Sequence, residues 1–391
     1  MAEVTLTFLG DMMCQMQQIR AMRKAHVEYG VAFDKIRHVL ASSDFVVGNL
    51  ETPVAGAKAR YAFEETRFNA PDEFLASVRN LGVSFVSTAN NHCMDRGVYG
   101  IDETIRKLDK LKIGHTGTYL DKEGADAPCV VDVQGVRVGL VSCTFEMNQG
   151  RKRDLLPPES AWKVDQLAPP KDFDTTLSFA ARRFVKNCIP YWLKVRLKRL
   201  KQGHRPNVGG VLADSAPESA IGCEAHRQYR ERIALKIKKA RQLSDVVVVL
   251  PHMGGQYNAE PGPFQKWTVR WMAEAGADLI ICNHAHTTLQ TETLDSGAFV
   301  AYALGNFSLT PGVGYYRPDC QADNSVVLNI VYDKEKKKIA RKYFYVTVNR
   351  LRDDGISEVA PARPEDCDTR SVVQRFSGRE LVPDADGRYC F

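Results

Sequence analysis

Five runs of β-forming residues in this chain end at, or just before, polar side chains that can bind metals. Helical segments separate most of these runs, which are rich in valine, isoleucine, leucine and phenylalanine. Such strands are typical of α/β proteins, whose ligands gather at the carboxyl ends of the strands. The runs and the polar residues after them are Val4–Leu9 with Asp11, Phe45–Val47 with Glu51, Val83–Ser87 with Asn91 and His92, Asp245–Leu250 with His252, and Asp278–Cys282 with His284 and His286.

The remaining segments predict helices, one hairpin and further strands. Helix signals cover Gln17–Leu40, Pro71–Asn80, Tyr99–Leu111, His226–Leu243 and Phe264–Ala275. A Gln134-Gly135 turn is expected to join Cys129–Val133 to Val136–Ser142 as a hairpin. Later strands, which we expect to form a second sheet packed on the first, are Val300–Leu304, Ser325–Val331 and Tyr343–Val348. The tail from Ser357 is expected to be extended or loosely held.

The composition is that of a globular protein and argues against several classes. Hydrophobic residues make up 44% and charged residues 26% of the 391 positions, and no stretch resembles a membrane span. The N-terminus lacks a basic leader with an apolar signal core, so we expect a soluble, cytoplasmic protein. Ten cysteines without a Cys-x-x-Cys pair predict reduced thiols. The net charge of +6 is modest for this length, and we expect no nucleic-acid partner.

The strand-end residues form a mixed set of oxygen and nitrogen donors, which suits Mn, Fe or Zn. The set consists of Asp11, Glu51, Asn91, His252, His284 and His286. Because His284 and His286 are two positions apart, both rings would point the same way in an extended segment. Taken singly, Asp11 could cap the following helix, and one histidine could be an ordinary core or surface residue. The repetition of ligand-type residues at five strand ends favours a metal site.

Six blocks of the sequence, in the right order, resemble those of the CapA family, which is named for poly-γ-glutamate capsule synthesis. The resemblance covers roughly residues 4–145 and 225–335, and the Asn-Asn-His and Gly-Asn-Phe blocks are specific in combination. The blocks are Phe8-Leu9-Gly10-Asp11, Gly48-Asn49-Leu50-Glu51-Thr52-Pro53, Ala89-Asn90-Asn91-His92-Cys93-Met94-Asp95-Arg96-Gly97, Pro251-His252-Met253-Gly254, Gly276-Ala277-Asp278-Leu279-Ile280-Ile281-Cys282-Asn283-His284-Ala285-His286 and Leu304-Gly305-Asn306-Phe307.

The resemblance implies a calcineurin-like metallophosphoesterase fold, a four-layer α/β/β/α sandwich in which strand-end motifs hold two metals. Asp11 and His286 would bind one metal, and Glu51 would be the bridging carboxylate. Asn91, His252 and His284 would hold the second metal. The ions would activate a water as the nucleophile.

The resemblance also implies roles beyond metal binding. His92 would stand next to the substrate as general acid or as a stabiliser of developing charge, and Asp95 would orient it. Substrate contacts are expected from Asn49, Asn90, Asn306 and Arg96.

Three positions depart from the wider metallophosphoesterase pattern. Met13 stands where that pattern has the histidine of Asp-x-His, which leaves open whether one metal is weakly held and the site mononuclear. Ala285 and Gln256 stand where many family members have proline and glutamate, and these changes bear on substrate specificity.

We expect residues 1–350 to form one CapA-like domain and residues 351–391 a C-terminal extension. An insertion at about 147–223 interrupts the domain and is a candidate lid. Within it, 182–201 is basic, has no acidic residue and carries an apolar stripe at helical spacing. Such a helix can lie on an anionic membrane surface or attract a polyanionic substrate. The alternative is a solvated face whose apolar stripe packs on the domain.

Three functions are open at this point. The first is a hydrolase that cleaves an amide or γ-glutamyl-type bond in an anionic small molecule, peptide or polymer. The second is a phosphoester hydrolase, because paired metals and a histidine suit that reaction equally well. The third is a non-catalytic accessory protein in poly-γ-glutamate or capsule synthesis. His92 argues against the third function, because it has no obvious use in metal retention alone.

Combined replacement of Lys194, Lys198 and Lys201 by alanine tests the basic segment. We expect weaker binding to polyglutamate or to anionic vesicles, because fewer charges attract the polyanion. Binding titrations at several salt concentrations measure the effect. A salt dependence equal to that of the unmodified protein would favour the solvated-face interpretation.

Overall fold

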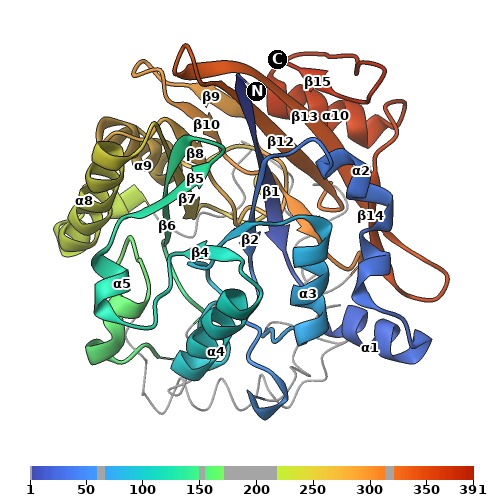
Figure 1. Ribbon diagram of the computed structural model, residues 1–391, viewed down its shortest axis with the longest axis horizontal. Coiled ribbons are helices and arrows are strands. Elements are labelled where there is room, and N and C mark those ends of the chain that lie inside the picture. The colour runs from blue at the N-terminus through green and yellow to red at the C-terminus, as the bar shows by residue number, and fades with distance from the viewer. Residues whose placement is uncertain (1, 60–66, 149–154, 171–217, 313–320) are drawn as a thin grey trace.

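The computed structural model describes residues 2–59, 67–148, 155–170, 218–312 and 321–391. In these ranges the chain forms two β-sheets that pack face to face between layers of helices (Figure 1). The four-layer α/β/β/α sandwich predicted from the sequence is therefore confirmed. The basic segment 182–201 and most of the 147–223 insertion lie outside the described residues, so the lid and the amphipathic helix stay predictions.

The first sheet has nine strands in the described chain. Its order is β14-β13-β12-β1-β2-β3-β4, with β11 paired to β1 and β15 paired to β13. β1 to β4 are parallel, whereas β12 runs antiparallel to β1. The strands are β1 Glu3–Met12, β2 Phe45–Leu50, β3 Phe85–Ser87, β4 Gly114–Thr116, β11 Asn306–Ser308, β12 Asn324–Asp333, β13 Lys338–Leu351, β14 Ser357–Pro361 and β15 Tyr389–Cys390.

The second sheet has six strands in the order β5-β6-β7-β8-β10-β9. β6, β7, β8 and β10 are parallel, and β5 and β9 are antiparallel edge strands. The predicted hairpin is confirmed: Gln134 and Gly135 both have positive φ, as a type I′ turn requires. The strands are β5 Cys129–Val133, β6 Val136–Thr144, β7 Val246–His252, β8 Leu279–Ile281, β9 Thr291–Thr293 and β10 Phe299–Ala301.

The division of strands between the sheets corrects the sequence prediction. β12 and β13, which contain Ser325–Val331 and Tyr343–Val348, extend the first sheet and do not form the second. β12 pairs with β1 along Glu3 to Phe8, the edge of β1 that β2 leaves open. Of the two alternatives for the tail from Ser357, the extended one is confirmed for β14, which pairs with β13 along its whole length, and the loosely held one is wrong.

Helices cover the outer faces of both sheets (Figure 1). The α-helices are α1 Met16–Ala25, α2 Arg37–Leu40, α3 Asp72–Leu81, α4 Gly97–Lys110, α5 Lys122–Asp126, α8 Arg227–Leu243, α9 Pro263–Glu274 and α10 Cys367–Ser377. Short 3-10 turns occupy Tyr29–Ala32, Asp34–Ile36, Ala57–Ala59, Pro158–Lys163, Glu218–Ala220 and Glu224–His226.

The alternation of side chains along the strands builds separate cores. On β7, Val248 faces the core between the sheets, where it joins Leu6 of β1. Its neighbours Val247 and Val249 face the opposite way and pack under α8 and α9. Burial on both faces explains why the central strands are continuous hydrophobic runs.

The helix predicted over Gln17–Leu40 is interrupted. α1 ends at Ala25 because His26 adopts a left-handed conformation, with φ of 53°. Its backbone N–H then caps the helix by donating to the carbonyl of Arg23. The following turns let Tyr29 and Phe33 pack against Phe74 of α3.

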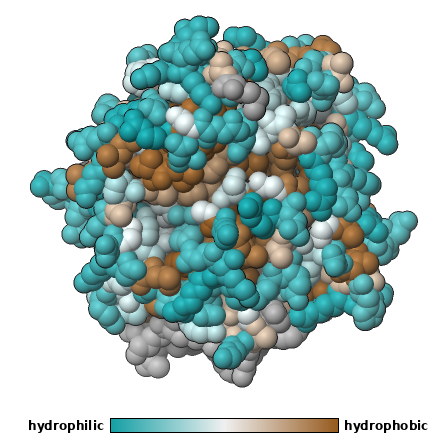
Figure 2. Space-filling model, in the orientation of Figure 1, coloured by the Kyte–Doolittle hydropathy of each residue, from teal (hydrophilic) through white to brown (hydrophobic). Residues whose placement is uncertain are grey.

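The face of the molecule seen in Figure 1 is mostly hydrophilic, as Figure 2 shows. A band of hydrophobic residues crosses its upper half, over the region of β5. β5 is an edge strand, and its Cys129 and Val131 are half-buried against the core between the sheets. We therefore interpret the band as the visible rim of that core.

A described part of the insertion, residues 155–170, connects the two sheets through hydrogen bonds. The backbone N–H of Asp165 donates to Gly117 beyond β4, and the N–H of Thr144 in β6 donates to Asp165, each at 2.9 Å. The Asp165 carboxylate is fully buried and accepts from Lys236 of α8 at 2.5 Å and from the Tyr119 hydroxyl at 2.6 Å. Burial raises the pKa of Asp165 and lowers the pKa of Lys236, against the effect of each partner's charge.

Replacing Lys236 by methionine is expected to lower the free energy of unfolding by about 3–5 kcal/mol, because Asp165 then stays buried without its cation. Urea denaturation of the metal-free protein measures the change. Lys238→Met on the exposed face of the same helix is the control and should change the free energy of unfolding by less than about 0.5 kcal/mol. Equal stability of the two variants would contradict a stabilising role for the pair.

Candidate metal centre

The five strand ends that carry the predicted ligands meet where the two sheets face each other. Asp11 lies in β1, Glu51 follows β2, and Asn91 follows β3, all in the first sheet. His252 ends β7 and the loop 283–288 follows β8, both in the second sheet. Because parallel strands bring their carboxyl ends to one edge, each sheet contributes one side of the site.

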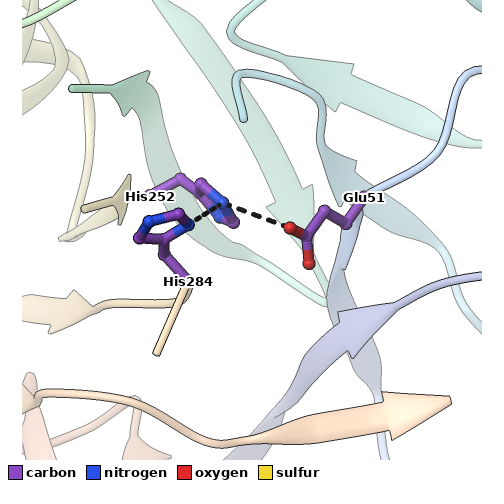
Figure 3. A group of neighbouring side chains, drawn as sticks. All are labelled: Glu51, His252 and His284. Carbon is purple, nitrogen blue, oxygen red and sulfur yellow. Dashed lines mark hydrogen bonds and ion pairs between the residues drawn. The ribbon is translucent and has the colours of Figure 1, made fainter. Parts of the chain in front are cut away.

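Two groups of candidate ligands share Glu51. One group is Glu51, His252 and His284, and the other is Asp11, Glu51 and His286. Within each group the candidate ligand atoms lie within 4.8 Å of one another, and all of these residues are buried. Figure 3 shows Glu51 extending toward His252, whose ring also contacts His284. The two groups are therefore adjacent candidate cation sites joined by one carboxylate.

The Glu51 carboxylate is fully buried, and neither oxygen has a hydrogen-bond partner among the described residues. Oε1 lies 3.5 Å from Nε2 of His252 and 3.7 Å from Nε2 of His286. These distances are too long for good hydrogen bonds but are near the roughly 3.3 Å between two ligands of one tetrahedral ion. A buried carboxylate without donors is costly unless a cation binds it. The residues therefore fit divalent ions.

Three ligand atoms converge in the group that contains His252. Nε2 of His252 lies 2.9 Å from Oδ1 of Asn91 and 2.9 Å from Nδ1 of His284. Burial, together with the neighbouring imidazoles of His252 and His286, lowers the pKa of His284 well below its ordinary value. His284 is thus a neutral imidazole, which is the form that binds metals.

The group that contains Asp11 carries an internal ion pair. Nδ1 of His286 lies 3.4 Å from Oδ2 of Asp11. Burial alone would lower the pKa of His286, but the charges of Glu51 and Asp11 raise it to about 9. Burial alone would raise the pKa of Asp11, but His286 and His252 lower it. The two carboxylates thus stabilise positive charge at the position of His286.

The loop that carries the last two histidines is not extended, contrary to the sequence prediction. His284 has a φ of 102° and His286 a φ of 55°, both in the region that favours glycine. The two rings converge with centroids 6.0 Å apart. Such conformations cost about 1–3 kcal/mol each and persist only where neighbouring contacts enforce them.

Three asparagines predicted to contact substrate are buried and bonded to protein groups. Asn49 Nδ2 donates to Oδ1 of Asp11 at 2.7 Å and lies 3.2 Å from Nδ1 of His252. Asn90 Nδ2 donates to the Leu50 carbonyl at 2.9 Å. Asn306 Oδ1 lies 2.9 Å from Nδ1 of His286. These contacts favour a positioning role for all three asparagines.

His92 lies beside this cluster with Asp95. Its Nδ1 is 2.7 Å from Oδ2 of Asp95, and its Nε2 is 3.9 Å from Oε1 of Glu51. Burial alone would lower the pKa of His92, but the charge and hydrogen bond of Asp95 raise it. Arg96, another predicted substrate contact, is half-buried and donates to the Asp95 carbonyl at 2.8 Å.

Sequence reasoning missed two residues around His92. The Phe68 ring lies over the imidazole, with centroids 4.2 Å apart. Nδ2 of the exposed Asn148 lies 3.3 Å from its Nδ1, and the Asn148 N–H donates to the Asn91 carbonyl at 2.7 Å. Neither residue stands at a strand end in one of the motifs, so no pattern in the sequence marked them.

Met13, which replaces a histidine of the wider pattern, packs in a small apolar cluster with Phe68 and Leu309. It is buried in this cluster and brings no imidazole to the group that contains Asp11. The candidate ligands in the group that contains Asp11 are two carboxylates and one imidazole, and three protein ligands are typical of open catalytic metal sites.

The sequence profile of the family described as "Bacterial capsule synthesis protein PGA_cap" matches residues 5–310, which include every predicted ligand. This chain belongs to the PGA_cap family. The membership agrees with the CapA resemblance seen in the motifs. The profile ends before β12, so β12 to β15 and α10 lie outside the matched region.

Two relatives of this PGA_cap protein carry the CapA name. "PGA biosynthesis protein CapA" of Bacillus subtilis is 24% identical over 313 residues, which are 79% of this chain and 64% of that protein. "Capsule biosynthesis protein CapA" of Bacillus anthracis is also 24% identical over 313 residues, 79% of this chain and 61% of that protein. The chain thus spans less than two thirds of the length of both relatives.

A solved structure described as a novel phosphatase from Mycoplasma pneumoniae aligns with 89% of this PGA_cap chain and 94% of that chain. At 12% identity and a TM-score of 0.40, that similarity supports no argument about this protein.

Among the described residues, no helix has the length and hydrophobicity needed to cross a membrane.

Replacing Glu51 by glutamine is expected to abolish the binding of metal to both groups, because both use this carboxylate. Asp11→Asn should weaken only one group and leave about one equivalent bound. Elemental analysis after equilibrium dialysis with Mn²⁺, and the rise in Tm on adding Mn²⁺, measure the effect. Glu73→Gln on the exposed start of α3 is the control. Wild-type metal content in Glu51→Gln would contradict the shared-ligand assignment.

Proposed function

We propose that this protein is a metal-dependent hydrolase that cleaves an amide or γ-glutamyl-type bond in an anionic peptide or polymer. The observation that carries the proposal is the buried Glu51 carboxylate, shared by two groups of candidate ligands and left without a hydrogen-bond donor among the described residues. A set of carboxylates, imidazoles and one amide suits Mn, Fe or Zn.

In this proposal the ligands are divided between the two groups. Asp11 and His286 hold one ion, His252, His284 and Asn91 hold the other, and Glu51 contacts both. Divalent ions bound there supply Lewis acidity and lower the pKa of a water. Asn49 and Asn306 orient Asp11 and His286 through their side-chain amides.

No cysteine nucleophile is required. Cys93, which follows His92, is buried, and burial raises the pKa of its thiol to about 12. A thiol in that environment is an unreactive hydrophobic residue, because only the thiolate is nucleophilic. Hydrolysis by activated water therefore fits the residues of this site better than a covalent route.

His92 is proposed as the general acid. Asp95 accepts a hydrogen bond from Nδ1, which directs Nε2 toward Glu51 and the candidate ligands. The charge and hydrogen bond of Asp95 raise the pKa of His92 and so favour a proton on the ring. From Nε2, this proton can pass to the leaving group as the bond breaks.

The names of two relatives support an anionic polymer substrate. They are a PGA biosynthesis protein and a capsule biosynthesis protein. Cations bound at Glu51 and Asp11 would attract carboxylate groups of such a chain. We therefore rank the amide or γ-glutamyl-type bond first.

Phosphoester hydrolysis is the second candidate. Two adjacent cation sites and a histidine proton donor suit a phosphoryl transition state as well as a tetrahedral one. The His92–Asp95 pair supports either reaction over a non-catalytic accessory role, because metal retention needs neither residue.

Metal content and parallel assays test the proposal. Elemental analysis of the purified protein is expected to find one or two equivalents of a divalent metal. Turnover of γ-glutamyl peptides, and of a chromogenic phosphodiester, is then compared with Mn²⁺ or Zn²⁺ added. Cleavage of the diester alone would move the assignment to phosphoester hydrolysis, and no metal with no turnover would support the accessory role.

His92→Ala is expected to abolish turnover but retain metal, because His92 is no ligand in the proposed site. His252→Ala should lose turnover and the metal held by the group that contains His252. The measurements are kcat and metal content, with His38→Ala on the exposed face of α2 as the control. Full activity of His92→Ala would remove the proton-donor role.

A further inference from the structure

The loop 284–288 holds two candidate ligands in unfavourable backbone conformations, so neighbouring contacts must hold it in place. Two of these contacts come from within the family-matched region. Asn306 Nδ2 donates to the His286 carbonyl at 3.0 Å. The backbone N–H of Tyr257 donates to the Ala285 carbonyl at 2.7 Å.

A further set of contacts comes from α10, which lies outside the matched residues 5–310. Nη1 of Arg375 donates to the Thr287 hydroxyl at 3.2 Å and to the Thr288 carbonyl at 3.4 Å. Its Nη2 donates to Oε1 of Gln321 at 2.5 Å. The guanidinium thus links α10 to the two residues that follow His286.

β13, also outside the matched region, supports the same loop indirectly. Asn349 Nδ2 donates to the Asn306 carbonyl at 2.8 Å, and Asn349 Oδ1 accepts from the Leu309 N–H at 3.0 Å. Asn306 in turn contacts both the ring and the carbonyl of His286. Two elements of the last part of the chain therefore act on one candidate ligand.

α10, which carries Arg375, is anchored in the hydrophobic core. Val372, Val373 and Phe376 are buried in the core between the sheets, and the Phe376 ring packs on Phe344 of β13 with centroids 4.9 Å apart. Figure 1 shows α10 beside β13 near the C-terminus of the chain. Because the core packing of α10 fixes the position of Arg375, hydrogen bonds from its guanidinium can restrain the loop.

We propose that Arg375 is a positioning residue for the candidate metal centre, which fixes the backbone after His286 so that both loop histidines face Glu51. The inference rests on the proposed metal binding. Contacts that orient metal ligands typically contribute 10–100-fold in metal affinity. In this proposal the C-terminal part of the chain contributes to metal affinity by positioning the candidate ligands.

The test compares Mn²⁺ and Zn²⁺ affinity of the full-length chain by calorimetric titration. Arg375→Ala is expected to raise the Kd about 10–100-fold. Arg375→Lys should raise it less, because an ammonium reaches fewer of the acceptors than the planar guanidinium. Thr287→Val, which removes one acceptor from the loop side, should also raise the Kd and serves if Arg375→Ala does not fold.

Two controls on α10 separate positioning from general stability. Arg370→Ala removes an exposed arginine and should leave both Kd and Tm unchanged. Val372→Ala removes core packing and should lower the Tm of the metal-free protein while leaving Kd nearly unchanged. A Kd raised equally by Val372→Ala and Arg375→Ala would overturn the specific role of Arg375.

Metal affinity of the wild type and of the variants separates failure of the positioning role from failure of the proposed function. Wild-type protein that binds neither ion would contradict the proposed function. Tight binding by the wild type, with unchanged affinity in folded Arg375→Ala and Thr287→Val, would overturn the positioning role alone.

Discussion

The buried carboxylate of Glu51 is the group on which the arrangement of the site depends. It is fully excluded from water, and among the described residues its oxygens accept no hydrogen bond. A charge in that environment needs positive charge close by. The Nε2 atoms of His252, His286 and His92 lie within 4 Å of Oε1 of Glu51. The Glu51 carboxylate also belongs to both candidate cation sites. The same buried carboxylate therefore lowers stability when no cation is bound and gives the site its capacity to bind cations.

The sandwich makes this convergence possible. Asp11 and Glu51 stand on the first sheet, whereas His252 and His284 stand on the second. Neither sheet alone carries a complete set of ligands. The core between the sheets, built from side chains such as Leu6 and Val248, therefore sets the distance between the two halves of the site. Asn306 of β11 and Arg375 of α10 then hold the loop that carries His286.

Much of the fold and the site was predictable because both depend on local patterns. Continuous hydrophobic runs predicted the central strands, and ligand-type residues after five of them predicted the candidate centre. The assignment of Ser325–Val331 and Tyr343–Val348 to a second sheet was wrong, because hydrophobic runs do not reveal which edge they pair with; β12 completes the open edge of β1. The helix predicted through His26 was wrong because a left-handed non-glycine residue leaves no local signal.

The sequence by itself determined the α/β class, the family and the identity of the candidate ligands, since strand periodicity and motif residues are local properties. Only the tertiary structure decided that Glu51 belongs to two groups, that Asn49 and Asn306 contact Asp11 and His286, and that Arg375, beyond residue 310, contacts the loop after His286. These relations join residues far apart in the chain. They depend on sheet pairing and core packing, which no local pattern specifies.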